Sequence, residues 1–240
     1  MTRVLLVDDD EYNLLIVRRF FPCPPLTVAT AFNGRVALEM VEQEVPDIMF
    51  MDLDMPVMGG MEAIGLLRKQ EADLGRPRGY VVVLSSHDDG ETRSRCLAAG
   101  FDHYLTKPVT RDLIQQTLLD FVSSAKAVTP PGSAAPVGSL APIVVDPDIF
   151  ELLAGFLPTR LKLLDDMGAD IASGDREGLR RRAHQLAGSL GLYGFHWAGE
   201  QAKQIETEAA GIDLQQAAVL VNDLRVHLQT ATIVRGETEQ

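Results

Sequence analysis

Cysteine is scarce in this chain, and long apolar runs are missing. Cys23 and Cys96 are the two cysteines among 240 residues, and their spacing fits no metal-binding motif. Two reduced packing thiols are typical of a cytosolic protein, so a cytoplasmic location is expected. No stretch reaches the roughly 18 consecutive apolar residues of a membrane span. The first residues enter a strand-like run directly, without the layout of a signal peptide, so neither a membrane protein nor a secreted one is expected.

Blocks of basic residues are also missing. Lys and Arg total 22 against 34 Asp and Glu, which gives a formal net charge of −12. Nonspecific binding to nucleic acid needs a basic surface, so that function is disfavoured. The sequence also lacks a glycine-rich nucleotide loop and a helix-turn-helix with a basic face, which argues against an ATP-dependent kinase domain and against DNA binding. The hydrophobic content of 46 % is enough to fill ordinary globular cores.

The first half of the chain alternates short apolar runs with amphipathic segments. Short apolar runs bounded by polar or turn residues are typical of buried parallel strands, with helices between them. Five such units predict an α/β doubly wound, five-stranded parallel sheet with helices on both faces. The expected strands are 3–7, 26–30, 47–51, 80–84 and 103–105, and the expected helices are 11–21, 34–44, 60–72, 90–99 and 110–126.

A change in composition divides the chain. Residues 127–142 are rich in Pro, Gly, Ser and Ala and have no periodicity, which predicts a flexible linker. Residues 1–126 then form one predicted domain and residues 143–235 a second. Helical periodicity dominates the second domain, and four helices with short connections predict an all-α four-helix bundle. The expected helices there are 147–172, 175–191, 196–209 and 213–232.

Polar residues stand where four of the predicted strands end. Asp8 and Asp9 follow the first strand and Asp52 the third, while Ser85 follows the fourth and Lys107 the fifth. In doubly wound folds, ligand and catalytic groups gather at the carboxyl ends of the strands. Carboxylates, a hydroxyl and an amine at one end of a sheet suit phosphoryl transfer, because a divalent cation and an ammonium can offset the charge of the moving group.

The segments that hold these residues resemble, in their order and spacing, the receiver domain of two-component response regulators. The resemblance covers roughly residues 1–125 and implies a flavodoxin-like receiver fold. The matching segments are Leu5–Asp10, Ala31–Gly34, Met51–Gly60, Leu84–Ser86, Ala98–Asp102 and Tyr104–Pro108.

The resemblance implies a phosphoacceptor and a metal site. Asp52 would form an acyl phosphate through one of its carboxylate oxygens. Mg²⁺ would be bound by Asp8, Asp9 and Asp52 together with the backbone carbonyl of Asp54. The next acidic residue, Asp10, is interpreted as the cap of the first helix.

The resemblance also implies how the phosphoryl group is held. Lys107 would pair with one phosphoryl oxygen, and the Lys107-Pro108 peptide bond is expected to be cis. Ser85 would hydrogen-bond another phosphoryl oxygen. Tyr104 would change rotamer together with that hydroxyl, so Ser85 and Tyr104 would form the switch.

The second predicted helix of the bundle carries a histidine among small residues. The apolar stripe of this helix leaves His184 on another face, with Ala187, Gly188 and Gly191 after it. Small residues there would leave room for another protein to approach a projecting imidazole. A neutral imidazole is a competent nucleophile toward phosphorus near neutral pH.

This histidine lies in segments that resemble a histidine phosphotransfer (HPt) domain over roughly residues 146–232. The matching segments are Phe156-Leu157, Leu163-Leu164, Arg182–Ser189, Gly194 and Ile205-Glu206. The resemblance implies that His184 carries a phosphoryl group. The family pattern has Lys three residues after the histidine, where this chain has Ala187. The candidates to orient the phosphate in its place are Arg180, Arg181 and Lys203.

The two resemblances together imply a phosphorelay signalling protein. Its chemistry as an enzyme would be limited to self-catalysed phosphorylation and dephosphorylation of Asp52. The expected partners are a sensor histidine kinase, which would phosphorylate Asp52, and receiver or HPt proteins that exchange a phosphoryl group with it or with His184. A homodimer through the last two receiver helices is also implied. Two alternatives stay open: a phosphorylation-switched module whose helical domain binds a partner without phosphotransfer, and a phosphate sink. The direction of flow between Asp52 and His184 is likewise open.

Overall fold

The chain divides into two compact units, Met1–Pro131 and Gly132–Gln240, and each is described by itself. The structure, a computed structural model, describes residues 2–21, 26–123 and 143–236. The predicted linker, 127–142, lies outside these described residues. Within them, no helix combines the length and the apolar character that crossing a membrane requires.

The first unit is a five-stranded sheet in the order β2-β1-β3-β4-β5, with every neighbouring pair parallel. This confirms the predicted doubly wound fold. Its elements are β1 (Thr2–Val7), α1 (Glu11–Phe20), β2 (Leu26–Ala31), α2 (Gly34–Gln43), β3 (Ile48–Asp52), α3 (Gly60–Leu74), β4 (Tyr80–Ser85), α4 (Gly90–Ala99), β5 (His103–Thr106) and α5 (Arg111–Ser123).

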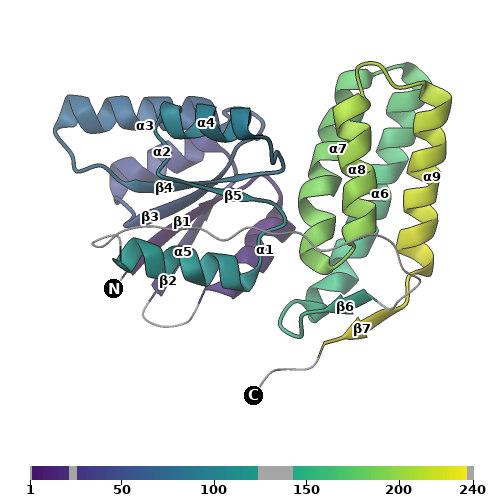
Figure 1. The fold of residues 1–240 in the computed structure, drawn as a ribbon, viewed down its shortest axis with the longest axis horizontal. Coiled ribbons are helices and arrows are strands. Elements are labelled where there is room, and N and C mark those ends of the chain that lie inside the picture. The colour runs from purple at the N-terminus through teal and green to yellow at the C-terminus, as the bar shows by residue number, and fades with distance from the viewer. Residues whose placement is uncertain (1, 22–25, 124–142, 237–240) are drawn as a thin grey trace. The chain divides into compact units, whose positions relative to one another are not determined.

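The direction of winding reverses between β1 and β3. The chain places β2 on one side of β1 and β3 on the other, so the loops after β1 and β3 diverge and leave a crevice at their carboxyl ends. Helices α1 and α5 cover one face of the sheet, and α2, α3 and α4 cover the other (Figure 1). The crevice is where Asp8, Asp9 and Asp52 emerge.

Close packing fixes the end of β3 relative to α3. All residues of β3 are buried, which accounts for its continuous apolar run. Gly60 begins α3, and a Cβ atom at this position would lie 2.5 Å from the carbonyl oxygen of Asp52. Only glycine allows this approach without displacing the backbone. The position of Asp52 is therefore set by the core on one side and by α3 on the other.

The second unit contains four α-helices in the part of the chain that is described, as predicted. Helix α6 packs against α7 and α9, and α8 packs against the same two helices. Asp175 and Asp213 cap α7 and α9, each accepting a hydrogen bond from a backbone N–H of the first turn. The helices are α6 (Leu153–Ser173), α7 (Arg176–Leu190), α8 (His196–Glu208) and α9 (Leu214–Thr230), with a 3₁₀ turn, η2 (Gly191–Tyr193), after α7.

The beginning and the end of this unit differ from the prediction. Two short strands, β6 (Ile143–Val145) and β7 (Ile233–Arg235), form a parallel pair where none was expected. The first helix was predicted from residue 147, but a 3₁₀ turn, η1 (Phe150–Leu152), precedes α6. The reason is a turn at Asp146, whose carboxylate accepts from the N–H of Asp148 while its carbonyl accepts from that of Ile149.

Candidate functional site

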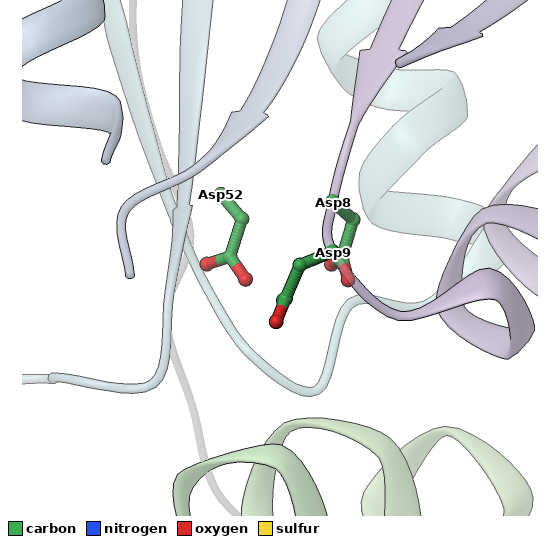
Figure 2. A group of neighbouring side chains, drawn as sticks. All are labelled: Asp8, Asp9 and Asp52. Carbon is green, nitrogen blue, oxygen red and sulfur yellow. The ribbon is translucent and has the colours of Figure 1, made fainter. Parts of the chain in front are cut away.

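Three carboxylates meet in the crevice at the ends of β1 and β3. Asp8 and Asp52 are each 2 % exposed, and Asp9 is partly exposed. One carboxylate oxygen from each residue lies within 4.8 Å of the others. Figure 2 shows the three side chains directed into the space between the two strand ends. The predicted acidic cluster is therefore assembled by the fold.

The ammonium group of Lys107 joins this cluster from the loop after β5. Its Nζ atom lies 2.9 Å from Oδ2 of Asp8 and 2.8 Å from Oδ2 of Asp52. Its backbone N–H donates to the carbonyl of Ser85, at 2.7 Å, and the Lys107-Pro108 bond is cis, as expected. The cation thus bridges a candidate metal ligand and the candidate phosphoacceptor.

Burial and charge shift the pKa values in this pocket. Burial raises the pKa of Asp8 most and Lys107 lowers it, while Asp52 raises it further, so that the pKa of Asp8 reaches about 7. Burial alone lowers the pKa of Lys107, but the charges and hydrogen bonds of Asp52 and Asp8 outweigh this and hold that pKa above its ordinary value. One buried cation therefore faces more carboxylates than it can neutralise.

The donor set fits a hard divalent cation such as Mg²⁺. Carboxylate oxygens are the protein ligands that Mg²⁺ prefers, and a second positive charge would favour the ionised form of Asp8, whose pKa is raised by burial and by the charge of Asp52. Asp8, Asp9 and Asp52 are placed to hold it. The role of the Asp54 carbonyl stays a prediction.

Asn13 supports this site and was not singled out from the sequence. Its Nδ2 atom donates to Oδ1 of Asp8 at 3.0 Å and lies 3.2 Å from Oδ2, and the residue is 4 % exposed. Asp10 caps α1, as interpreted, by accepting from the N–H of Tyr12. A signal was available, because Asn13 is a polar residue on the buried and otherwise apolar face of α1.

The two predicted switch residues are linked through His87. Ser85 is fully buried, and its Oγ accepts from the N–H of His87 at 3.1 Å. The hydroxyl of Tyr104 donates to the carbonyl of His87 at 2.5 Å, and Tyr104 is 4 % exposed. The His87 imidazole lies 3.8 Å from a carboxylate oxygen of Asp54. His87 was not among the residues predicted for the switch, so this connection was missed.

In the second unit, a carboxylate orients the imidazole of His184. The Nδ1 atom lies 2.9 Å from Oε1 of Glu206 on α8. Burial alone raises the pKa of Glu206, but the hydrogen bond and charge of His184, with the charge of Lys203, bring it below its ordinary value. An ionised carboxylate only accepts, so Nδ1 carries the hydrogen and the lone pair of the neutral ring is at Nε2.

The expectation that His184 projects from a cleared helix face is wrong. Only 7 % of His184 is exposed, because Glu206 holds the ring against α8. The small residues after it are also used within the bundle. A Cβ atom at Gly199 of α8 would lie 3.5 Å from the backbone of Gly191 and 3.7 Å from that of Ala187. They therefore let α7 and α8 approach closely.

The three candidate cations near His184 differ in their surroundings. Lys203 lies 3.3 Å from Oε2 of Glu206, the carboxylate that holds the histidine. Arg180 pairs with Glu177 at 2.9 Å on the helix surface, and Arg181 is exposed. Lys203 is thus connected to His184 through Glu206.

A doubly wound sheet with this acidic crevice, followed by a bundle that carries an oriented histidine, defines a two-module phosphotransfer protein. Residues 4–119 match the model of the response regulator receiver domain, and residues 151–232 match that of the Hpt domain. The chain is therefore a receiver domain joined to an Hpt domain, two modules of phosphorelay signalling.

Relatives of known name share one or both modules. The chain is 33 % identical over 123 residues to the sensor protein GacS of Pseudomonas syringae pv. syringae, an alignment covering 51 % of this chain and 14 % of GacS. It is 28 % identical over 232 residues to the sensor histidine kinase GacS of Pseudomonas protegens, covering 91 % of this chain and 25 % of that protein. The chain thus spans a quarter or less of the length of these relatives.

Among solved structures, the receiver domain of Francisella response regulator 1452 is similar over 52 % of this chain and 100 % of that domain. The two are 28 % identical in sequence, and the TM-score is 0.47.

Proposed function

We propose that this chain passes phosphoryl groups between Asp52, His184 and partner proteins of a phosphorelay. The observation that carries the proposal is the buried contact of Asp52 with Lys107 beside Asp8 and Asp9. The similarity to a sensor histidine kinase supports such a kinase as the phosphoryl donor, and the two matched domains support receiver or HPt proteins as further partners. A homodimer through the receiver and a cytoplasmic location remain part of the proposal.

Asp52 would be phosphorylated by in-line displacement. One of its carboxylate oxygens forms a bond to phosphorus as the P–N bond of a phosphohistidine on the kinase breaks and its electron pair returns to that imidazole. Lys107 pairs with the oxygens of the moving group and keeps its own proton, and Ser85 donates its hydroxyl hydrogen to another of them. Mg²⁺ held by Asp8, Asp9 and Asp52, with the Asp54 carbonyl, would offset the remaining negative charge.

The switch would follow from the competition for Ser85. In the structure, the hydroxyl of Ser85 accepts a hydrogen bond from the N–H of His87. When Ser85 donates to a phosphoryl oxygen, its hydroxyl would move and change this hydrogen bond. Tyr104 is bonded to the same His87 residue, so its rotamer responds to the rearrangement. Phosphorylation at Asp52 would in this way alter the surface around β4 and β5.

His184 would exchange the group with the aspartate of a receiver. A P–Nε2 bond forms as the P–O bond of the acyl phosphate breaks and the carboxylate leaves. The imidazole gains positive charge during this step, and Glu206 offsets it while holding the hydrogen at Nδ1. No proton has to leave the ring, so the step is reversible.

The test uses the full chain and a small phosphodonor, phosphoramidate, with Mg²⁺. We expect a hydroxylamine-sensitive acyl phosphate that is lost in Asp52→Asn and in EDTA. We also expect an acid-labile, base-stable phosphohistidine that is lost in His184→Gln. Asp73→Asn, which removes an exposed carboxylate of α3, is the matched control and should label normally. Labelling at Asp52 that is undiminished by EDTA, or phosphohistidine that survives His184→Gln, would refute the assignment.

A further inference from the structure

Helices α7 and α8 pack against each other along one row of residues on each helix. On α8, Gly199, Lys203 and Glu206 follow one another at the spacing of one helix face. Glu206 meets His184 at 2.9 Å, and Gly199 meets the backbone of Gly191 and Ala187. Because the helices run antiparallel, the position opposite Ala187 belongs to Lys203.

Ala187 is where the HPt pattern has a lysine. A short side chain there leaves space beside His184 on α7, and a lysine stands across it on α8. The ammonium of Lys203 lies 3.3 Å from Oε2 of Glu206, whose other oxygen holds the imidazole. The Lys203 side chain is 29 % exposed, so its end is not locked in the core. Lysine, carboxylate and imidazole therefore form one connected group across the two helices.

We infer that Lys203 is the cation that binds the phosphoryl group on His184. It would take the role of the lysine that the HPt pattern has on α7, but from a position on α8. The inference deepens the proposed function and rests on it. When the P–Nε2 bond forms and the P–O bond of the donor breaks, the group arriving beside the ring bears negative charge. Lys203 moves from Glu206 alone to bridge Glu206 and a phosphoryl oxygen. It acts as a charge-assisted hydrogen-bond donor.

The surroundings of the two arginines favour this assignment. Arg180 is held at the surface of α7 by Glu177, at 2.9 Å, and Arg181 is exposed on the same helix. The ammonium of Lys203 instead contacts Glu206, the carboxylate that orients His184.

The experiment moves the cation back across the helix interface. The full chain carries Asp52→Asn, which removes the competing acceptor, and phosphoramidate is the donor, its P–N bond breaking with loss of ammonia. We expect Lys203→Ala to slow phosphohistidine formation about tenfold, the loss of one charge-assisted contact. Adding Ala187→Lys to Lys203→Ala should restore most of the rate, and Lys203→Arg should keep it. Lys162→Ala, which removes a lysine from α6, is the control and should have no effect.

The outcomes distinguish the role of Lys203 from the proposed phosphorylation of His184. If His184→Gln abolishes the label but Lys203→Ala labels at the wild-type rate, the role of Lys203 is wrong and the proposed function stands. If Ala187→Lys fails to restore the slow variant while circular dichroism and the melting temperature match wild type, the cation has no positional role and the inference fails. If His184→Gln leaves the label unchanged, the proposed function fails instead. Recovery by the relocated lysine cannot come from local packing at position 203.

Discussion

Binding of Mg²⁺ should depend on pH, because the metal competes with a proton on Asp8. The carboxyl group of Asp8 has its pKa raised from 3.8 to about 7, chiefly by burial, and Mg²⁺ requires the ionised form. Below that pKa each unit of pH costs about a tenfold loss of apparent affinity, and above it the affinity levels off. From about pH 6 to about pH 8, the dissociation constant should therefore fall by about tenfold.

The same shift predicts the opposite trend for the metal-free protein. The folded state binds the proton of Asp8 more tightly than the unfolded state, so this contribution to stability is complete below the ordinary pKa. It is lost as the pH rises from about 4 to about 7, a change of roughly 4 kcal/mol in the free energy of unfolding from this group. Mg²⁺ should restore stability most strongly at the alkaline end.

Isothermal titration calorimetry with Mg²⁺ at several pH values measures this directly. Buffers of different ionisation enthalpy should report close to one proton released per metal ion at the acidic end and almost none at the alkaline end. Asp8→Asn is the control, because it removes the titrating group and should flatten the profile. Equal affinity at both ends for the wild-type protein, with no proton release, would refute the argument from burial.

Three further changes test other contacts. Asn13→Ala should weaken Mg²⁺ binding about tenfold, since it removes the amide that orients Asp8, and an unchanged titration would show that the orientation is not needed. Lys107→Ala should slow labelling by phosphoramidate about a hundredfold while Mg²⁺ still binds, and rapid labelling would contradict its role. Arg68→Ala should lower the free energy of unfolding by about 3 kcal/mol, because Arg68 binds Asp102 at 2.7 Å from a site 14 % exposed. Urea denaturation measures the free energy of unfolding of Arg68→Ala, and a change near zero would contradict the stabilising role of Arg68.

Much of the receiver unit could be predicted from local signals. Strands β3 and β4 are apolar runs buried along almost their whole length, so their pattern is visible in the sequence without knowledge of the neighbouring strands. The proximity of Asp52 and Lys107 could be predicted because a doubly wound sheet places the carboxyl ends of its strands at one edge. The contact of Asn13 with Asp8 was harder, since it depends on the rotation of α1 against the sheet.

The surroundings of His184 could not be predicted in the same way. Periodicity of α7 alone identifies its apolar stripe, but the distance to α8 depends on contacts between residues of different elements, such as Gly191 and Gly199. That distance decides whether Glu206 reaches the imidazole. The strands β6 and β7 were missed for another reason, because three residues are too few to display an alternation.

The pairing of β6 with β7 has a consequence for how the helical unit can be joined to other proteins. Ile143 lies beside Ile233 and Val145 beside Arg235, so the chain enters and leaves this unit at one place (Figure 1). A unit whose ends are adjacent can be spliced into a surface loop of a host without forcing the ends of that loop apart. The helical bundle could therefore be inserted into another protein, with β6 and β7 as the two points of connection.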